Sequence, residues 1–373
     1  MHHYIWQSES WPFLTWDNDQ LIDPLSRCRL FQGKLLGRLA FIEKDMVKEA
    51  QAELLVEETM QTAGIEGHLL DKESVRSSVA RRLGLDTGGL PLPERHADGL
   101  VEVLIDATEN YDRPLTFERL KAWQAAIFPT GYSGLNRIIT GDWRGPEPMQ
   151  VVSGPVGREK IHYEAPPHNR IEKEMTDFLN WWQKSLNTCE GILRAGTAHF
   201  FFVTIHPFED GNGRIARAVT DMAMAQDENL RQRFYSLSAR IAADRNDYYD
   251  ILEKTQKGDG DITLWLKWFL DCFSRAVSSS DKTLEKIFAK SAFWKIHTKT
   301  TLTERQRKVI NKLLDAGKKG FEGGLTTRKY ASMTKSSNAT AQREISDLVD
   351  KKVLNRNPGG GRSTSYDLIW PHI

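Results

Sequence analysis

The chain has 373 residues, of which 40% are hydrophobic and 27% charged, and this composition is that of a soluble protein with two or three domains. Its formal net charge is +1, it has no apolar run near the ~18 residues of a membrane span, and it begins without signal-peptide features, so no membrane partner is expected. Its three cysteines, Cys28, Cys189 and Cys272, are odd in number and far apart, which indicates buried thiols in a reducing cytoplasm rather than a disulfide framework.

The apolar pattern predicts a mainly α protein in three parts, which cover residues 1–95, 96–298 and 299–373. In the first part, three tryptophans recur every five residues in an irregular opening segment, which suits aromatic anchoring onto a helical body. A periodic apolar pattern then predicts a long helix over about 25–58, with one break. Gly and Pro residues over 84–93 are typical of a loop.

The second part is expected to be helical except for one section. β-Branched residues on both sides of a turn at 153–157 predict a β-hairpin within 143–163. Ala165-Pro-Pro167 then introduces another helix.

The segment His206-Pro-Phe-Glu-Asp-Gly-Asn-Gly-Arg-Ile-Ala-Arg217 follows an apolar stretch and precedes a second helical pattern. We therefore expect a helix, a loop, and a second helix that begins at Gly211-Asn212-Gly213. The N–H groups at a helix N-terminus attract anions, and glycines let the backbone approach a phosphate closely. The pattern predicts a phosphate site at this helix start.

The side chains of the same segment suit phosphate chemistry. His206 can act as a general base near neutral pH, and Asp210 is a hard oxygen ligand of the kind that Mg2+ accepts. Arg214 and Arg217 lie three residues apart on one helix face, where their guanidinium groups suit phosphate oxygens. The Walker pattern and the common zinc spacings are absent, which excludes a P-loop enzyme and a zinc site of those types.

The segment resembles the Fic family signature HPFx(D/E)GNGRxxR at every specified position. The resemblance implies an Mg2+-dependent protein adenylyltransferase that moves AMP from ATP to a Ser, Thr or Tyr hydroxyl of a protein, in a fold with a helical Fic core and a small β-hairpin flap. The implied catalytic residues are His206, Asp210 (also the metal ligand), Asn212 and Arg217. The implied nucleotide-binding residues are Gly211, Asn212, Gly213, Arg214, Arg217, Tyr248 and Tyr249.

Two of these implied roles have structural alternatives. In Fic proteins the hairpin, called the flap, docks the target by strand pairing, which would here involve Val151, Val152, Ser153 and Gly154. An ordinary surface hairpin is the alternative. For Tyr248 and Tyr249, packing in the core is the alternative to contact with the nucleotide.

The stretch Thr62-Ala-Gly-Ile-Glu66-Gly67 matches [S/T]xxxE(G/N), which marks an inhibitory helix in Fic proteins. The resemblance implies that Glu66 pairs with Arg217 and takes the place of a γ-phosphate oxygen. An exposed helix glutamate is the alternative. The opening segment, over 4–17, resembles an N-terminal domain of unknown function that is often fused to bacterial Fic cores, so an N-terminal helical regulatory domain is expected.

The third part is basic, because residues 301–373 carry a net charge of +7 against −6 for the rest of the chain. Its pattern predicts helices over 304–316, 326–333 and 334–349, and then a hairpin over 354–368 with a glycine-rich tip. These elements resemble a winged helix-turn-helix, which implies that DNA contacts the third helix, with Arg343, and the wing, with Arg362. Dimerisation or protein docking is the alternative.

Other functions remain open. The same loop could remove AMP, with Glu66 orienting a water, or transfer phosphate or phosphocholine. A third reading is a DNA-binding regulator whose core senses nucleotide. The intact motif favours AMP transfer. Fic proteins often modify themselves or dimerise, so the chain itself as a substrate and a homodimer are further expectations.

Overall fold

The computed structural model describes residues 4–40, 44–87, 89–153, 160–317, 320–358 and 364–370. Over these residues the chain forms fourteen α-helices and three two-stranded antiparallel hairpins, which confirms the mainly α fold. None of the helices in this part of the chain is long and apolar enough to cross a membrane. All three cysteines are free; Cys28 and Cys272 are buried, and Cys189 is half-buried.

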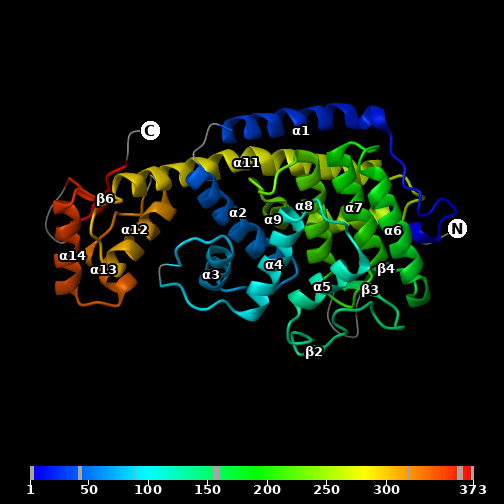
Figure 1. Ribbon diagram of the computed structural model, residues 1–373, viewed down its shortest axis with the longest axis horizontal. Helices are drawn as coiled ribbons and strands as arrows, with labels where there is room; N and C mark the ends of the chain where they lie inside the picture. Colours follow the sequence, from blue (N-terminus) through cyan, green and yellow to red (C-terminus); the bar gives the residue numbers. More distant parts are fainter. Residues whose placement is uncertain are drawn as a thin grey trace. The chain divides into compact units, whose positions relative to one another are not determined.

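The chain divides into two compact units, residues 1–42 with 51–280 and residues 43–50 with 281–373. The boundaries expected near 95 and 298 stay predictions. The expected long helix over 25–58 is two helices, of which the first ends at Leu39 and the second begins at Lys44; residues 41–43 lie outside the described part. The helices of the first unit are α1 (Asn18–Leu39), α2 (Lys44–Ile65) from residue 51, α3 (Lys72–Arg82), α4 (Arg95–Glu109), α5 (Phe117–Ile127), α6 (Ile171–Ser185), α7 (Gly191–Ile205), α8 (Asn212–Glu228), α9 (Leu237–Ala243), α10 (Arg245–Gln256) and α11 (Thr263–Ile296) up to residue 280 (Figure 1).

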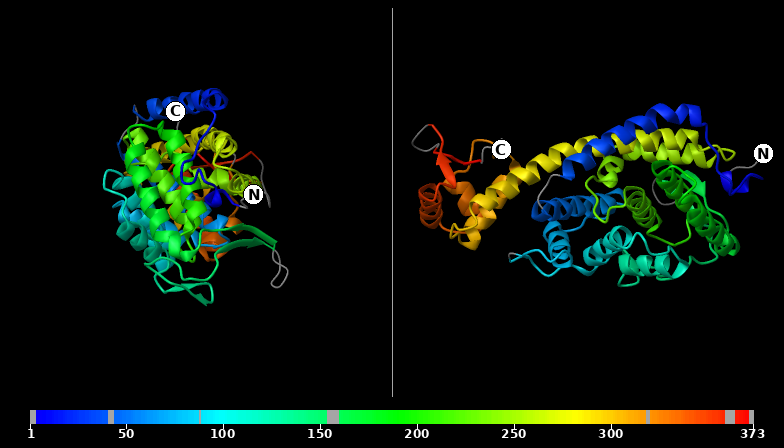
Figure 2. Two further views of the ribbon diagram at one scale, coloured as in Figure 1. Left: turned by 90° about the vertical axis from the view of Figure 1, so that its right-hand side faces the viewer. Right: turned by 45° about the horizontal axis from the view of Figure 1, so that its top comes forward.

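Helices α7 and α8 form the centre of the first unit and lie side by side in each view (Figures 1 and 2). Every residue of α7 after Gly191 is buried, as expected for a helix that is apolar nearly all round. Gly196 of α7 lets α11 approach, because a Cβ at this position would lie 2.8 Å from the Phe269 ring. The Trp265 indole also donates a 2.8 Å hydrogen bond to the Gly196 carbonyl.

The opening segment is anchored on the body of the first unit by aromatic side chains, as the sequence predicts. The Trp11 indole donates to Glu174 Oε2 at 2.5 Å and packs edge-on against Phe201. The Trp6 indole donates to the Glu164 carbonyl at 2.8 Å. Further along the chain, α1 runs beside the first part of α11, where the Cys28 thiol lies 3.2 Å from the Leu270 carbonyl (Figures 1 and 2).

The predicted hairpin consists of β3 (Gln150–Ser153) and β4 (Lys160–Glu164), which pair with Val152 opposite Ile161. These two side chains are 47% and 45% exposed. The buried Tyr163 anchors β4, since its hydroxyl donates to the Thr204 carbonyl at the end of α7 at 2.7 Å. The tip of the hairpin, over 154–159, lies outside the described residues and includes Gly154.

The second unit has the three helices and the hairpin that the sequence predicts. They are α12 (Glu304–Ala316), α13 (Thr327–Thr334), α14 (Asn338–Asp350), β5 (Leu354–Arg356) and β6 (Tyr366–Leu368). The third helix begins at Asn338 instead of 334, because the Ser337 hydroxyl caps it by accepting from the Thr340 N–H. Arg362 falls within 359–363, outside the described residues.

Candidate active site

The six-residue loop 206–211 joins α7 to α8 through two left-handed residues. His206 ends α7 with φ at 52°, and Gly211 precedes α8 with φ at 91°. Asn212 holds the loop closed: its side chain accepts from the Phe208 N–H at 2.9 Å and donates to the Phe208 carbonyl at 2.8 Å. The buried Asn212 side chain therefore shapes the loop, and a contact of Asn212 with a phosphate stays a prediction.

The imidazole of His206 is held in one orientation. Its Nδ1 lies 3.1 Å from the Val203 carbonyl, which can only accept, so Nδ1 carries the proton and Nε2 is the basic nitrogen of the neutral ring. Burial lowers the pKa of His206, and the positive charge of Arg144 lowers it further. A neutral imidazole near pH 7 is the form that can take a proton.

Arg144 is a positioning residue that the sequence did not reveal. Its guanidinium is buried, donates from Nε to the His206 carbonyl at 2.8 Å, and also donates to the Pro166 carbonyl. Its backbone N–H donates to the Pro207 carbonyl at 2.9 Å. Arg144 thus ties the loop to the chain just after β4. A single arginine before a hairpin carries no sequence signal for such a contact.

Asp210 lies partly exposed at the end of the loop. Its carboxylate accepts from the Gly211 N–H at 2.5 Å and from the hydroxyl of Ser133, in the short hairpin of β1 (Tyr132–Ser133) and β2 (Asn136–Arg137), at 2.5 Å. The described residues hold no cluster of three or more His, Cys, Asp or Glu side chains that could bind a metal. A single carboxylate still fits Mg2+, which commonly takes one or two carboxylates together with substrate phosphates and water.

Arg217 meets the end of α2, as the inhibitory pattern implies. Its Nη2 donates to Glu66 Oε1 at 2.7 Å and to the Thr62 carbonyl at 3.0 Å, and its Nε donates to the Thr62 hydroxyl at 2.6 Å. Burial alone would lower the pKa of Arg217, but the Glu66 carboxylate raises it above its usual value. The Glu66–Arg217 ion pair lies directly against Gly213. A Cβ at this position would lie 2.1 Å from Glu66 Oε1.

Two buried donors on the arginines of α8, Arg214 Nε and Arg217 Nη1, have no hydrogen-bond partner among the described residues. Arg214 lies over the Phe128 ring at 4.6 Å and reaches Asp210 Oδ1 only at 3.4 Å. A buried donor without a partner is unfavourable, so these groups fit an anion that accepts from both arginines.

Tyr248 and Tyr249 lie near Arg217 in different surroundings. Tyr248 is 3% exposed, and its hydroxyl lies 2.9 Å from His199 Nε2 within an aromatic cluster with Trp265, so it packs in the core. Tyr249 is half-buried beside Arg245; burial raises the pKa of its hydroxyl, and the Glu66 charge raises it further.

The Arg144 contact predicts the titration of His206. In Arg144→Met, we expect the pKa of His206 to rise, because a positive charge that opposes protonation of the ring is lost. Arg144→Lys keeps the positive charge, so the pKa of His206 in this variant should stay closer to that of the wild type. The measurement is an NMR titration of the histidine ring signals, assigned with His206→Ala. An unchanged His206 pKa in Arg144→Met would contradict the assigned role.

Comparison with known proteins is consistent with this geometry. Residues 4–85 match a family described as a domain of unknown function, DUF4172, and residues 114–224 match the Fic/DOC family. The protein adenylyltransferase Fic of Nematostella vectensis is 32% identical over 115 residues, which are 31% of this chain and 25% of the relative. That of Aedes aegypti is 24% identical over 239 residues, which are 62% of this chain and 42% of the relative. The chain therefore spans less than half of either relative.

Two solved structures share the fold. A Fic family protein from Desulfovibrio desulfuricans is 18% identical with a TM-score of 0.52, over 94% of this chain and 96% of that one. A Fic domain containing signaling protein from Bacteroides thetaiotaomicron is 18% identical with a TM-score of 0.51, over 71% of this chain and 97% of that one. The segment 206–217 lies near the C-terminal end of residues 114–224, which match the Fic/DOC family.

Proposed function

We propose that the chain is a protein adenylyltransferase, which transfers AMP from ATP to a hydroxyl side chain of a protein. The observation that carries this proposal is the pair of unpartnered buried donors on Arg214 and Arg217, in the helix whose start lies beside His206 and Asp210. Curated relatives named protein adenylyltransferase support the same activity at the level of the family.

In the proposed reaction His206 Nε2 takes the proton from the attacking hydroxyl. The hydroxyl oxygen forms a bond to the α-phosphorus of ATP, the bond to the β-phosphate side breaks, and pyrophosphate leaves. Arg214 and Arg217 bind the outer phosphates, and the N–H groups at the start of α8 face the phosphate chain. Mg2+, held by Asp210, would neutralise phosphate charge when bound.

Glu66 is proposed to restrain this reaction, because it occupies the donor that an outer phosphate needs. Arg217 keeps only Nη1 free of hydrogen bonds while Glu66 and Thr62 hold Nε and Nη2. Two unit charges ~4 Å apart attract by about 4 kcal/mol at an effective dielectric near 20, before desolvation is included. A net coupling of about 1–3 kcal/mol would weaken productive ATP binding roughly 5- to 150-fold.

Incubation with Mg2+ and ATP labelled at the α- or the γ-phosphate tests both proposals. Label should be retained on protein only from the α-position, should increase by roughly 5- to 150-fold in Glu66→Gly, and should vanish in His206→Ala. Glu73→Gly, at an exposed glutamate in α3, is the matched control and should behave as the wild type.

Other results of the same assay point to the other functions. Label from the γ-position would indicate phosphate transfer. Retention that does not change in Glu66→Gly would exclude restraint by Glu66. Loss of AMP from a protein labelled beforehand, dependent on Glu66, would indicate AMP removal.

We also propose the β3–β4 hairpin as the docking edge for the target protein, since Val152 and Ile161 are exposed opposite each other above an anchored base. Val152→Asp should reduce labelling of protein at a given ATP concentration, because a charge replaces an apolar contact, while ATP affinity measured by calorimetry stays unchanged. Ile22→Asp, at an apolar residue of α1 that is 56% exposed, is the control. Equal labelling in both variants would argue for an ordinary surface hairpin.

For the second unit we propose DNA binding, because it is basic and the first turns of α14 expose Asn338, Gln342 and Arg343. Fluorescence anisotropy with duplex DNA should show salt-dependent binding, and Arg343→Ala should lower the affinity and reduce the salt slope by about one. Lys351→Ala, whose ammonium pairs with Asp347 at 2.6 Å, is the control. Absence of salt-dependent binding by the wild type would favour dimerisation or protein docking.

A further inference from the structure

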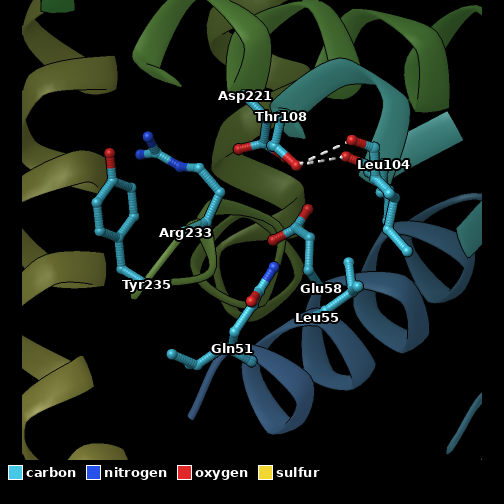
Figure 3. Close-up of a pocket in the computed structure, with 10 residues that line it drawn as sticks. Gln51, Leu55, Glu58, Leu104, Thr108, Asp221, Arg233 and Tyr235 are labelled. Atoms are coloured by element: carbon cyan, nitrogen blue, oxygen red, sulfur yellow. Dashed lines mark hydrogen bonds between the residues drawn. The ribbon is translucent and has the colours of Figure 1, made fainter. Parts of the chain in front are cut away.

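A small cavity lies between α2, α4 and α8, and two carboxylates share it (Figure 3). Glu58 of α2 and Asp221 of α8 line it together with Arg233, Tyr235 and apolar side chains of α2 and α4. In Figure 3 the Glu58 carboxylate points from α2 toward the side of the cavity that holds Asp221. The cavity volume is about 20 Å3, which is room for about one water molecule.

The same faces of α2 and α8 carry the ion pair of the candidate active site. Glu58 and Thr62 are four residues apart on one face of α2, and Glu66, four residues further on, directly follows the end of the helix. Arg217 and Asp221 are likewise four residues apart on α8. At one end of the contact between α2 and α8, Glu66 and Arg217 therefore attract each other. At the other end two acids, Glu58 and Asp221, line the same cavity.

The two acids differ in their hydrogen bonds. Glu58 accepts from the Ser236 hydroxyl at 2.6 Å, from the Ser238 N–H at 3.2 Å and from the Ser238 hydroxyl. Asp221 is 5% exposed, and within the described part of the chain its carboxylate takes part in no hydrogen bond or ion pair. Glu58 thus has the partners of an ionised carboxylate, whereas nothing compensates a charge on Asp221 directly.

Burial raises the pKa of Asp221 well above its ordinary value, and the Glu58 charge raises it further. Glu228 acts in the same direction, while Arg233 and Arg217 oppose it. Arg233 is the larger of the two opposing charges; its guanidinium also pairs with Glu228 at 2.7 Å, and its buried Nε has no hydrogen-bond partner among the described residues. When two acids share a buried space, one of them keeps its proton.

We propose that Asp221 carries a proton while α2 is docked on α8, and that loss of this proton loosens α2 and releases Arg217 from Glu66. A neutral Asp221 can donate a hydrogen bond toward Glu58 or a cavity water. An ionised Asp221 places a second negative charge beside Glu58 in a small space that apolar side chains line in part, and separation of α2 from α8 relieves this repulsion. The proposal rests on the proposed restraint by Glu66 and supplies its trigger, a change of pH.

The direction of the pH dependence follows from the raised pKa of Asp221. The docked state holds the Asp221 proton more tightly than the undocked state does, so docking is fully stable at pH values below the ordinary aspartate pKa. It weakens as the pH rises through the pKa of the docked state. Restraint of the site should therefore decrease with increasing pH.

Hydrogen exchange of residues 55–66, corrected for the intrinsic dependence on pH, tests the proposal in the full chain. From about pH 5 to about pH 8, protection of α2 in the wild type should fall and ATP affinity measured by calorimetry should rise, roughly 5-fold or more. Asp221→Asn keeps the shape without the charge, so both quantities should stay at the low-pH wild-type level. Glu58→Gln, which removes the opposing charge, should also flatten the dependence and serves as the second variant.

Besides His206 of the site, His68 is a histidine near Glu66, and burial lowers its pKa. His68→Gln is therefore the control and should keep the wild-type pH dependence. A flat profile in His68→Gln, or a wild-type profile in Asp221→Asn and Glu58→Gln, would overturn the proposal.

Neither exchange nor ATP affinity requires AMP transfer. A pH-dependent α2 without any transfer of label would refute the proposed activity and leave the Asp221 switch standing. A pH-independent α2 in an active enzyme would refute the switch alone.

Discussion

The loop between α7 and α8 is the constraint on which the site depends. A buried helix must end, reverse and restart within six residues, and each backbone polar group on the way needs a partner. Asn212 satisfies both polar groups of Phe208, Arg144 satisfies the His206 carbonyl, and the His206 N–H bonds back to Phe202. These bonds hold His206 in a left-handed conformation that a non-glycine residue seldom adopts. Under the proposed function, the N–H groups at the start of α8 face the phosphates of ATP.

Arg217 connects this loop to the N-terminal helices. Its side chain is almost fully buried, so its donors must be used by the protein or by a ligand. In the structure Glu66 and Thr62 take most of them. Under the proposed function an outer phosphate of ATP competes for the same guanidinium, and regulation then reduces to how firmly α2 packs against α8. Gly213 permits both arrangements, because it has no Cβ between the loop and Glu66.

Much of this arrangement could be predicted from the sequence, because local patterns determine it. Helical periodicity predicted α7 and α8, the Gly-Asn-Gly run predicted the start of α8, and β-branched residues predicted the β3–β4 hairpin. The family pattern also implied the pairing of Glu66 with Arg217, which the structure contains. Long-range contacts left no such pattern. Arg144, Ser133 and Asp221 act on residues 62, 77 and 163 positions away, on His206, Asp210 and Glu58. Their side chains are ordinary for the segments that carry them.

The contact between α2 and α8 is not built for the greatest stability. If docking were its only purpose, an apolar side chain at 221 would fill part of the cavity and remove the conflict with Glu58, and such replacements of buried charged groups are often stabilising. Asp221 instead leaves a water-sized space and a buried acid that has no hydrogen-bond or ion-pair partner among the described residues. Because Glu58 lies on α2 and Glu66 directly follows the last residue of that helix, a charge that appears at Asp221 is transmitted over about two helical turns to the pair Glu66–Arg217. Under this proposal, the lower stability at the Glu58 end of α2 makes the Glu66–Arg217 pair at the other end responsive to pH.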